Sequence, residues 1–202
     1  RRDKFDIRKS VGYDGIHLKL VKVAAEYIAE PIAYIINCSL SKGVFPDKLK
    51  KARVTPIFKK RCAYEVGNYR PISVLPVFSK LFESFANKQL CAFMDKFKIL
   101  SENQYGFRRQ YSTKLALADL TAEISKRIDE DFVTLGAFID LRKAFDTIDH
   151  SNLLAKLQQY GIRWSTLNWF KTFLDGRQQY VSTKNNDSDC ETISTGVPQG
   201  SI

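Results

Sequence analysis

Apolar residues recur every three or four positions through much of the chain, which predicts amphipathic helices. The first such stretch covers residues 14–41. Pro31 lies inside it and should interrupt the helix, so two helices are favoured over one. The same spacing predicts four further helices, over residues 80–97, over 113–128, from Asp149, His150 or Ser151 to Gly161, and over 164–174.

Two residues mark expected helix ends. Gly43 follows the first helical stretch, where a glycine C-cap is common. Ser79 precedes the stretch 80–97 and is a favoured N-cap residue.

Shorter apolar runs predict strands. Residues 53–58 are rich in β-branched side chains, and Pro56 places that strand at a sheet edge. Residues 178–184 and 190–193 should pair as a hairpin around 185–187. Helices dominate and the strands are short and hairpin-like, so the expected fold class is α+β with short antiparallel strands.

The run from Val133 to Ile139 predicts a further, buried strand that ends in a single carboxylate, Asp140. A carboxylate at such a position is partly desolvated and needs a cation nearby to stay ionised. A metal ligand is one interpretation. The alternative is an N-cap of a helix that begins at Leu141. Asp146 and Asp149 come too late to share that strand end and are interpreted as turn or helix carboxylates.

Charge is distributed unevenly along the chain. The net charge is +10. Residues 1–61 hold 15 Lys and Arg against 6 Asp and Glu, whereas residues 62–202 hold 17 against 16. A polyphosphate ligand favours such asymmetry because each neutralised phosphate releases counterions. A basic surface without a ligand is the alternative.

The cysteine and hydropathy patterns bear on location. No run of about 18 apolar residues is present, so no membrane span is expected. The cysteines are far apart and never occur as C-x-x-C, which predicts reduced, mostly buried thiols in an intracellular protein. They are Cys38, Cys62, Cys91 and Cys190.

Three further features suit nucleotide chemistry. An aromatic ring at Phe145, under a bound sugar, would leave no room for a 2′-hydroxyl, although a core aromatic in a first helical turn is the alternative. Pro71 holds Arg70 extended, and a guanidinium held in this way can bind phosphate oxygens through two hydrogen bonds. Gln199, in a Gly- and Pro-rich loop, offers an amide that both donates and accepts.

A basic and aromatic segment, Asn103 to Arg109, fits stacking and backbone contact on a nucleic acid strand, with a plain surface loop as the alternative. Lys59, Lys60 and Arg61 form a basic patch shortly before Arg70.

Eight strings in order resemble the reverse transcriptase of non-LTR retrotransposons, the jockey-like and related LINE-type elements, over nearly the whole chain. They are GYDGIHLKLVK, GVFPDKLKKARVTPIFKK, NYRPISVLPVFSKLFE, NQYGFRRQYST, AFIDLRKAFDTIDH, LLAKLQQYGI, WFKTFLDGRQQYVS and TGVPQGSI.

The resemblance implies a right-hand polymerase with fingers-like and N-terminal helical parts over 1–132 and a partial palm over 133–202. It implies that Asp140 is a catalytic metal ligand for Mg²⁺, helped by the backbone carbonyl of Leu141, with two ions in the complete enzyme. It further implies four dNTP-contacting residues: Arg70, Lys59, Phe145 as the sugar-selecting aromatic, and Gln199.

The implied reaction is attack of the 3′-hydroxyl of a DNA primer on the α-phosphate of a dNTP. An RNA template selects the dNTP that is added. The implied setting is the cytoplasm and nucleus. The family's Y/F-A-D-D string, which carries the other two metal aspartates, does not occur in residues 1–202. These residues by themselves are therefore expected to be inactive and to leave apolar surface beside Phe138 uncovered.

Two alternatives stay open. One is a non-catalytic nucleic-acid-binding remnant of such an element. The other is a relative in the same superfamily, such as a group II intron maturase or a telomerase-like enzyme. The pattern makes no prediction of oligomeric state.

Overall fold

The computed structural model describes residues 11–59, 62–141, 143–183 and 186–199. Contacts divide the chain into two compact units, one formed by residues 1–88 and 143–202 and the other by residues 89–142. Both helices and strands are present, which confirms the predicted α+β class.

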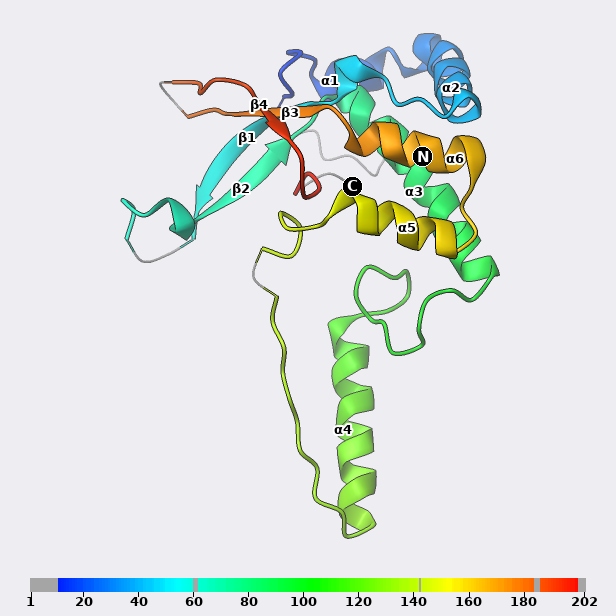
Figure 1. Cartoon of the computed structure of the whole chain (residues 1–202), viewed down its shortest axis with the longest axis vertical. Helices are drawn as coiled ribbons and strands as arrows, with labels where there is room; N and C mark the ends of the chain where they lie inside the picture. The colour runs from blue at the N-terminus through cyan, green and yellow to red at the C-terminus, as the bar shows by residue number, and fades with distance from the viewer. Residues whose placement is uncertain (1–10, 60–61, 142, 184–185, 200–202) are drawn as a thin grey trace. The chain divides into compact units, whose positions relative to one another are not determined.

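A four-stranded sheet in the order β2-β1-β3-β4 lies in the first unit (Figure 1). β1 pairs antiparallel with β2, β3 pairs antiparallel with β4, and β1 pairs parallel with β3. The strands are β1 (Lys51–Phe58), β2 (Tyr69–Val74), β3 (Arg177–Val181) and β4 (Glu191–Ile193).

The β1 strand and the β3–β4 hairpin match the sequence prediction. Pro56 lies opposite Pro71, beyond the last β1–β3 pair at Val54 and Val181. The expectation that this strand lies at a sheet edge was therefore wrong, because β1 lies between β2 and β3. Pro56 is tolerated because it lies where β1 has a partner on the β2 side only. Residues 184 and 185, the end of the predicted first hairpin strand and the start of the predicted turn, lie outside the described residues.

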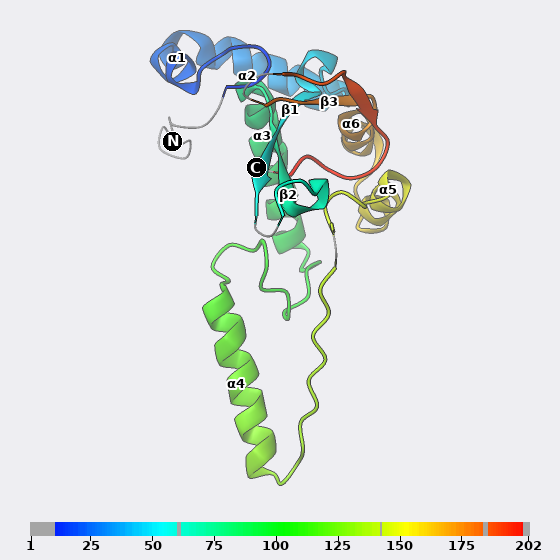
Figure 2. The same cartoon turned by 90° about the vertical axis from the view of Figure 1, so that its left-hand side faces the viewer.

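Helices of the first unit pack against one another beside the sheet, and α6 lies beside both α2 and α5 (Figure 2). Their bounds are α1 (Leu18–Val23), α2 (Ala25–Lys42), α3 (Val77–Lys96, which ends in the second unit), α5 (His150–Gln159) and α6 (Trp164–Leu174), with short 3₁₀ turns η1 (Asp47–Leu49) and η2 (Val66–Asn68).

The position of the break between the first two helices was predicted wrongly. The break falls at Ala24, and Pro31 lies inside α2. A proline removes one helical hydrogen bond. The helix nevertheless continues past Pro31, because the residues that follow it pack into the core: Ile32, Ile36 and Leu40. The Ser79 N-cap was also wrong: α3 starts at Val77, and the buried Ser79 hydroxyl donates to Glu83 Oε1 at 2.9 Å.

The core of the first unit is built around the fully buried ring of Phe45. Phe82, Trp169 and Phe173 meet it edge-on, with centroids at 5.9, 5.3 and 5.1 Å. Such aromatic contacts add to the hydrophobic stabilisation of α2, α3 and α6.

Gly43 ends α2 as predicted, with φ 66°. A Cβ there would lie 2.4 Å from the Ser165 carbonyl oxygen, so only glycine lets α6 approach this closely.

The second unit contains α4 (Thr113–Asp129), which confirms the predicted helix over 113–128. The Ser112 hydroxyl accepts from the Leu115 amide at 3.2 Å and caps it. The apolar periodicity that predicts this helix includes three residues that are exposed: Leu117, Leu120 and Ile128.

The predicted strand over Val133–Asp140 is absent. This segment is extended, but no described residue pairs with it. The Val133 side chain is 98% exposed and that of Phe138 90%, which confirms the expected uncovered apolar surface. An apolar run forms a strand only when a second strand takes its backbone hydrogen bonds.

The four cysteines are free thiols. The prediction that they are mostly buried was wrong, because Cys62, Cys91 and Cys190 are exposed. Among the described residues, no helix combines the length and apolar character that crossing a membrane requires.

Candidate functional site

Two irregular segments of the first unit, the turn 143–149 and the loop 194–199, are joined by backbone hydrogen bonds. The bonds run from Val197 N to Phe145 O at 2.8 Å and from Gly196 N to Ile148 O at 2.7 Å. A third bond, from Ser73 N to Gln199 O at 2.8 Å, ties the loop to the outer edge of β2. The fold therefore brings the backbone of Phe145, Gln199 and β2 together.

Gly196 makes this close approach possible. Its φ is +81°, and a Cβ built there would lie 2.7 Å from the Asp146 carbonyl oxygen. Both the left-handed conformation and the contact with backbone require glycine. The motif Gly-x-Pro-x-Gly thus has a structural cause at its first glycine, whereas its second, Gly200, lies outside the described residues.

A polar hollow of about 400 Å³ opens beside this junction. Its lining combines hydroxyl, amide and backbone groups and one carboxylate with the apolar side chains of two prolines, an isoleucine and a valine. The lining residues are Pro71, Ser73, Asp146, Gln179 and the segment 192–199. The neutral donors and acceptors in this mixed lining suit a ligand that carries both polar groups and apolar surface, such as a sugar or a base.

Phe145 lies in the turn and is 39% exposed. The alternative of a core aromatic in a first helical turn was wrong, because the described residues after Asp140 form no helix until His150. The alternative of Asp140 as a helix N-cap fails for the same reason.

Arg70 and Lys59 lie on the β1–β2 hairpin. Arg70 pairs directly with Ile57, and the amide of Lys59 donates to the carbonyl of Asn68 at 3.0 Å. Strand alternation places Arg70 and Lys59 on one face of this hairpin and Ser73 on the other. Both basic side chains are exposed, and neither lines the polar hollow. Lys60 and Arg61 lie outside the described residues.

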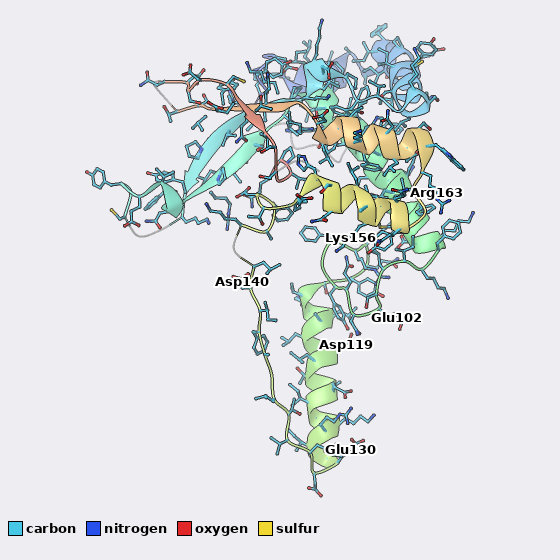
Figure 3. All side chains as sticks on the ribbon, in the orientation of Figure 1. Glu102, Asp119, Glu130, Asp140, Lys156 and Arg163 are labelled. Atoms are coloured by element: carbon cyan, nitrogen blue, oxygen red, sulfur yellow. The ribbon has the colours of Figure 1, made fainter. Side chains whose placement is uncertain are left out.

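Asp140 and Leu141 belong to the second unit, at the end of its extended segment (Figure 3). The Asp140 side chain is exposed. Their carboxylate and carbonyl oxygens are the donor types that a hard divalent cation prefers. Within the described residues, no group of three or more His, Cys, Asp or Glu side chains could hold a metal ion.

The segment around Tyr105 is an irregular loop, as predicted. The Arg108 guanidinium lies 4.1 Å from the Tyr111 ring centroid and donates to the Ser101 carbonyl. Tyr105 donates to Asp119 Oδ2 at 2.6 Å, and this hydrogen bond raises the pKa of Tyr105. The hydrogen bond between Tyr105 and Asp119 therefore joins the loop to α4.

The turn leads into α5 through Asp149. Its carboxylate accepts from the Ser151 hydroxyl and from the Asn152 amide, and these bonds lower the pKa of Asp149. The interpretation of Asp149 as a helix carboxylate is confirmed. Asp146 lies in the turn, as predicted, but its place in the lining of the polar hollow was missed.

His150 was also missed as a site residue. Its Nε2 lies 2.7 Å from the Gly196 carbonyl oxygen. A histidine at a helix start carries no sequence signal for this contact, since its partner is 46 residues away.

Residues 50–202 match the family described as "Reverse transcriptase (RNA-dependent DNA polymerase)". The chain is also similar to three proteins of Drosophila melanogaster. It is 30% identical over 200 residues to the RNA-directed DNA polymerase from mobile element jockey, covering 98% of this chain and 22% of that protein.

The second is the probable RNA-directed DNA polymerase from transposon BS, at 31% identity over 203 residues, covering 97% of this chain and 22% of that protein. The third is the probable RNA-directed DNA polymerase from transposon X-element, at 29% identity over 195 residues, covering 96% of this chain and 21% of that protein. The chain thus spans about a fifth of the length of these relatives.

Proposed function

This chain belongs to the reverse transcriptase (RNA-dependent DNA polymerase) family, and from that premise we propose that it forms part of an RNA-directed DNA polymerase of a non-LTR retrotransposon. The proposed reaction adds a dNTP to the 3′-hydroxyl of a DNA primer on an RNA template. Its proposed setting is the cytoplasm and nucleus. Residues 1–132 form the fingers-like and N-terminal part in this proposal, and residues 133–202 the partial palm.

The observation that carries the proposal is the junction of three chain segments beside one polar hollow. Backbone hydrogen bonds bring Phe145, Gln199 and the Ser73 edge of β2 together. These segments are distant in sequence, and two of the residues are those that the family resemblance assigns to nucleotide contact. Gln199 lines the hollow, and the backbone of Phe145 is bonded to Val197, which also lines it.

The remaining roles follow from side-chain chemistry. Arg70 and Lys59, on one face of the hairpin, supply the positive charge that a triphosphate requires. The oxygens of Asp140 and Leu141 would hold Mg²⁺, which when bound supplies charge stabilisation for phosphoryl transfer. The extended segment ending at Asp140 becomes a palm strand in this proposal when another strand pairs with it.

The direct test is primer extension by a full-length protein that carries this chain, on an RNA template with dNTPs and Mg²⁺. Synthesis that depends on Asp140 supports the proposal. Binding of the template–primer without any synthesis would favour the non-catalytic remnant.

Phe145→Ala should let ribonucleotides compete with deoxyribonucleotides. The ring would exclude a 2′-hydroxyl by steric contact, and specificity of this kind rests on repulsion of the wrong substrate. We expect the preference for dNTP over rNTP, measured as the ratio of kcat/KM values, to fall by at least about tenfold, a change of about 1.4 kcal/mol.

Phe145→Tyr is the matched control for this variant. It keeps the ring and should keep most of the preference. An unchanged ratio in Phe145→Ala would remove the sugar-selecting role from this residue.

Binding of the 202-residue chain to an RNA–DNA duplex should weaken steeply with salt. Each phosphate contact contributes about 0.7 to 0.9 to the slope of log K against log salt concentration. The double variant Arg70→Ala, Lys59→Ala should therefore lower the slope by roughly 1.4 to 1.8, measured by fluorescence anisotropy at several salt concentrations.

Lys156→Ala is the matched control, because it removes an exposed positive charge from α5 instead of the hairpin. Its slope should match that of the parent chain. A flat salt response of the parent chain, or equal slopes for all variants, would mean that the hairpin does not contact phosphates.

A further inference from the structure

His150 makes a short side-chain contact with the loop 194–199. Its Nε2 lies 2.7 Å from the Gly196 carbonyl oxygen. A second side-chain contact, from Thr195 Oγ1 to the Asp146 carbonyl, is longer at 3.5 Å. The histidine therefore adds the shorter side-chain bond to the two backbone bonds that hold this loop against the turn 143–149.

The chemistry of this contact defines the proton position. A carbonyl oxygen only accepts hydrogen bonds, so Nε2 must carry the proton. Both the neutral Nε2–H tautomer and the imidazolium satisfy this requirement. The side-chain amide nitrogen of glutamine lies about as far from its Cα as Nε2 lies from the Cα of histidine. An uncharged glutamine can therefore replace His150 as the hydrogen-bond donor.

His150 belongs to a helix that is capped and packed into the first unit. It is the first residue of α5, whose N-terminus is capped by Asp149 and whose Leu157 side chain is buried. The loop 194–199, in contrast, contains no helix or strand. Its position depends on the bonds it makes to the turn, to His150 and to the β2 edge.

The consequence reaches the proposed nucleotide site. Gly196 is bonded to His150, the next residue Val197 is bonded to Phe145, and Gln199 follows two residues later. A displacement of Gly196 would therefore move Gln199 relative to the Phe145 ring. The close packing of Gly196 on the Asp146 backbone leaves little freedom for an alternative placement.

We propose that His150 is a positioning residue for the nucleotide site. It holds the loop 194–199 at a set distance from the turn 143–149 and thereby sets the spacing between Phe145 and Gln199. This inference rests on the proposed function, but its first test does not require activity.

The first test is hydrogen exchange in the 202-residue chain. His150→Ala should raise the exchange rates of the Gly196 and Val197 amides by about three- to tenfold, the loss expected for one hydrogen bond. Amides in the middle of α5 should keep their parent rates. His150→Gln, which can still donate, should restore slow exchange in the loop.

His17→Ala is the matched control, since it removes the other histidine of the chain at an exposed position before α1. Its loop amides should exchange as in the parent. Equal exchange in His150→Ala and the parent would overturn the proposal, and so would a His150→Gln variant that exchanges as fast as His150→Ala.

The second test uses a full-length protein that carries this chain. His150→Ala should raise the KM for dNTP by about three- to tenfold with kcat changed less than about twofold, and His150→Gln should restore the KM. A faster-exchanging loop with an unchanged KM would overturn the link to the nucleotide. Failure of the parent protein to extend a primer would instead count against the proposed function, while the exchange test would still decide whether His150 holds the loop.

Discussion

Asp140→Asn is expected to abolish DNA synthesis by a full-length protein that carries this chain, with a loss of at least about 10³-fold. A metal ion supplies several kcal/mol of transition-state stabilisation, and each 1.4 kcal/mol is a factor of about ten. An amide is a poorer ligand than a carboxylate because it lacks the negative charge. The measurement is single-nucleotide primer extension in Mg²⁺.

Folding and nucleic acid binding should survive this change. Asp140 is exposed, and the structure gives its side chain no hydrogen bond or ion pair with the described residues. We therefore expect the melting temperature and the affinity for a template–primer to change little. Equal loss of synthesis and binding would mean that Asp140 supports the fold instead of the reaction.

Asp131→Asn is the matched control for the same charge change. Asp131 is an exposed residue of the same unit with φ 62°, a conformation that asparagine also tolerates. It should retain synthesis. A comparable loss in Asp131→Asn would attribute the effect to charge in general and not to a metal ligand.

Trp169→Ala is expected to destabilise the fold by about 3–5 kcal/mol, the cost typical of removing a large buried aromatic. Trp169 is 1% exposed, and its ring stacks on Phe173 at 5.6 Å and meets Phe45 edge-on at 5.3 Å. Its indole N–H also donates to the Ser39 hydroxyl at 3.0 Å. One substitution thus removes contacts between α6, α2 and the core.

A loss of this size is a large part of the 5–15 kcal/mol that holds a typical domain folded. Urea unfolding followed by far-UV circular dichroism would measure it without relying on tryptophan fluorescence. Trp164→Ala is the matched control, because Trp164 begins the same helix but is 86% exposed. It should change the free energy of unfolding by less than about 0.5 kcal/mol, and similar losses in both variants would contradict the assigned core.

Local chemistry accounts for the elements that could be predicted. The helices over 113–129 and 164–174 follow from apolar periodicity, and the Gly43 and Asp149 ends from the capping preferences of those residue types. Each of these signals acts within a few residues of chain. Elements that depend on such short-range signals can therefore be predicted without knowledge of the fold.

The wrong predictions of secondary structure concern segments whose conformation depends on residues distant in the sequence. Pro31 should break a helix by local rules, yet the core contacts of Ile32 and Ile36 keep α2 intact across it. The run before Asp140 has the composition of a buried strand, but a strand also needs a partner, and the described residues supply none. Composition indicates what a segment can become, while pairing decides whether it does.

By itself, the sequence determined the fold class, the family and which residue types are available for nucleotide chemistry, because these depend on periodicity and on motifs in order. Only the tertiary structure decided which of them meet: Gly196 lies against the turn at Phe145 and Ile148, and His150 reaches a carbonyl 46 residues away. The physical reason is that hydrogen bonds and packing act through space, so contacts between remote segments leave no local pattern in the chain.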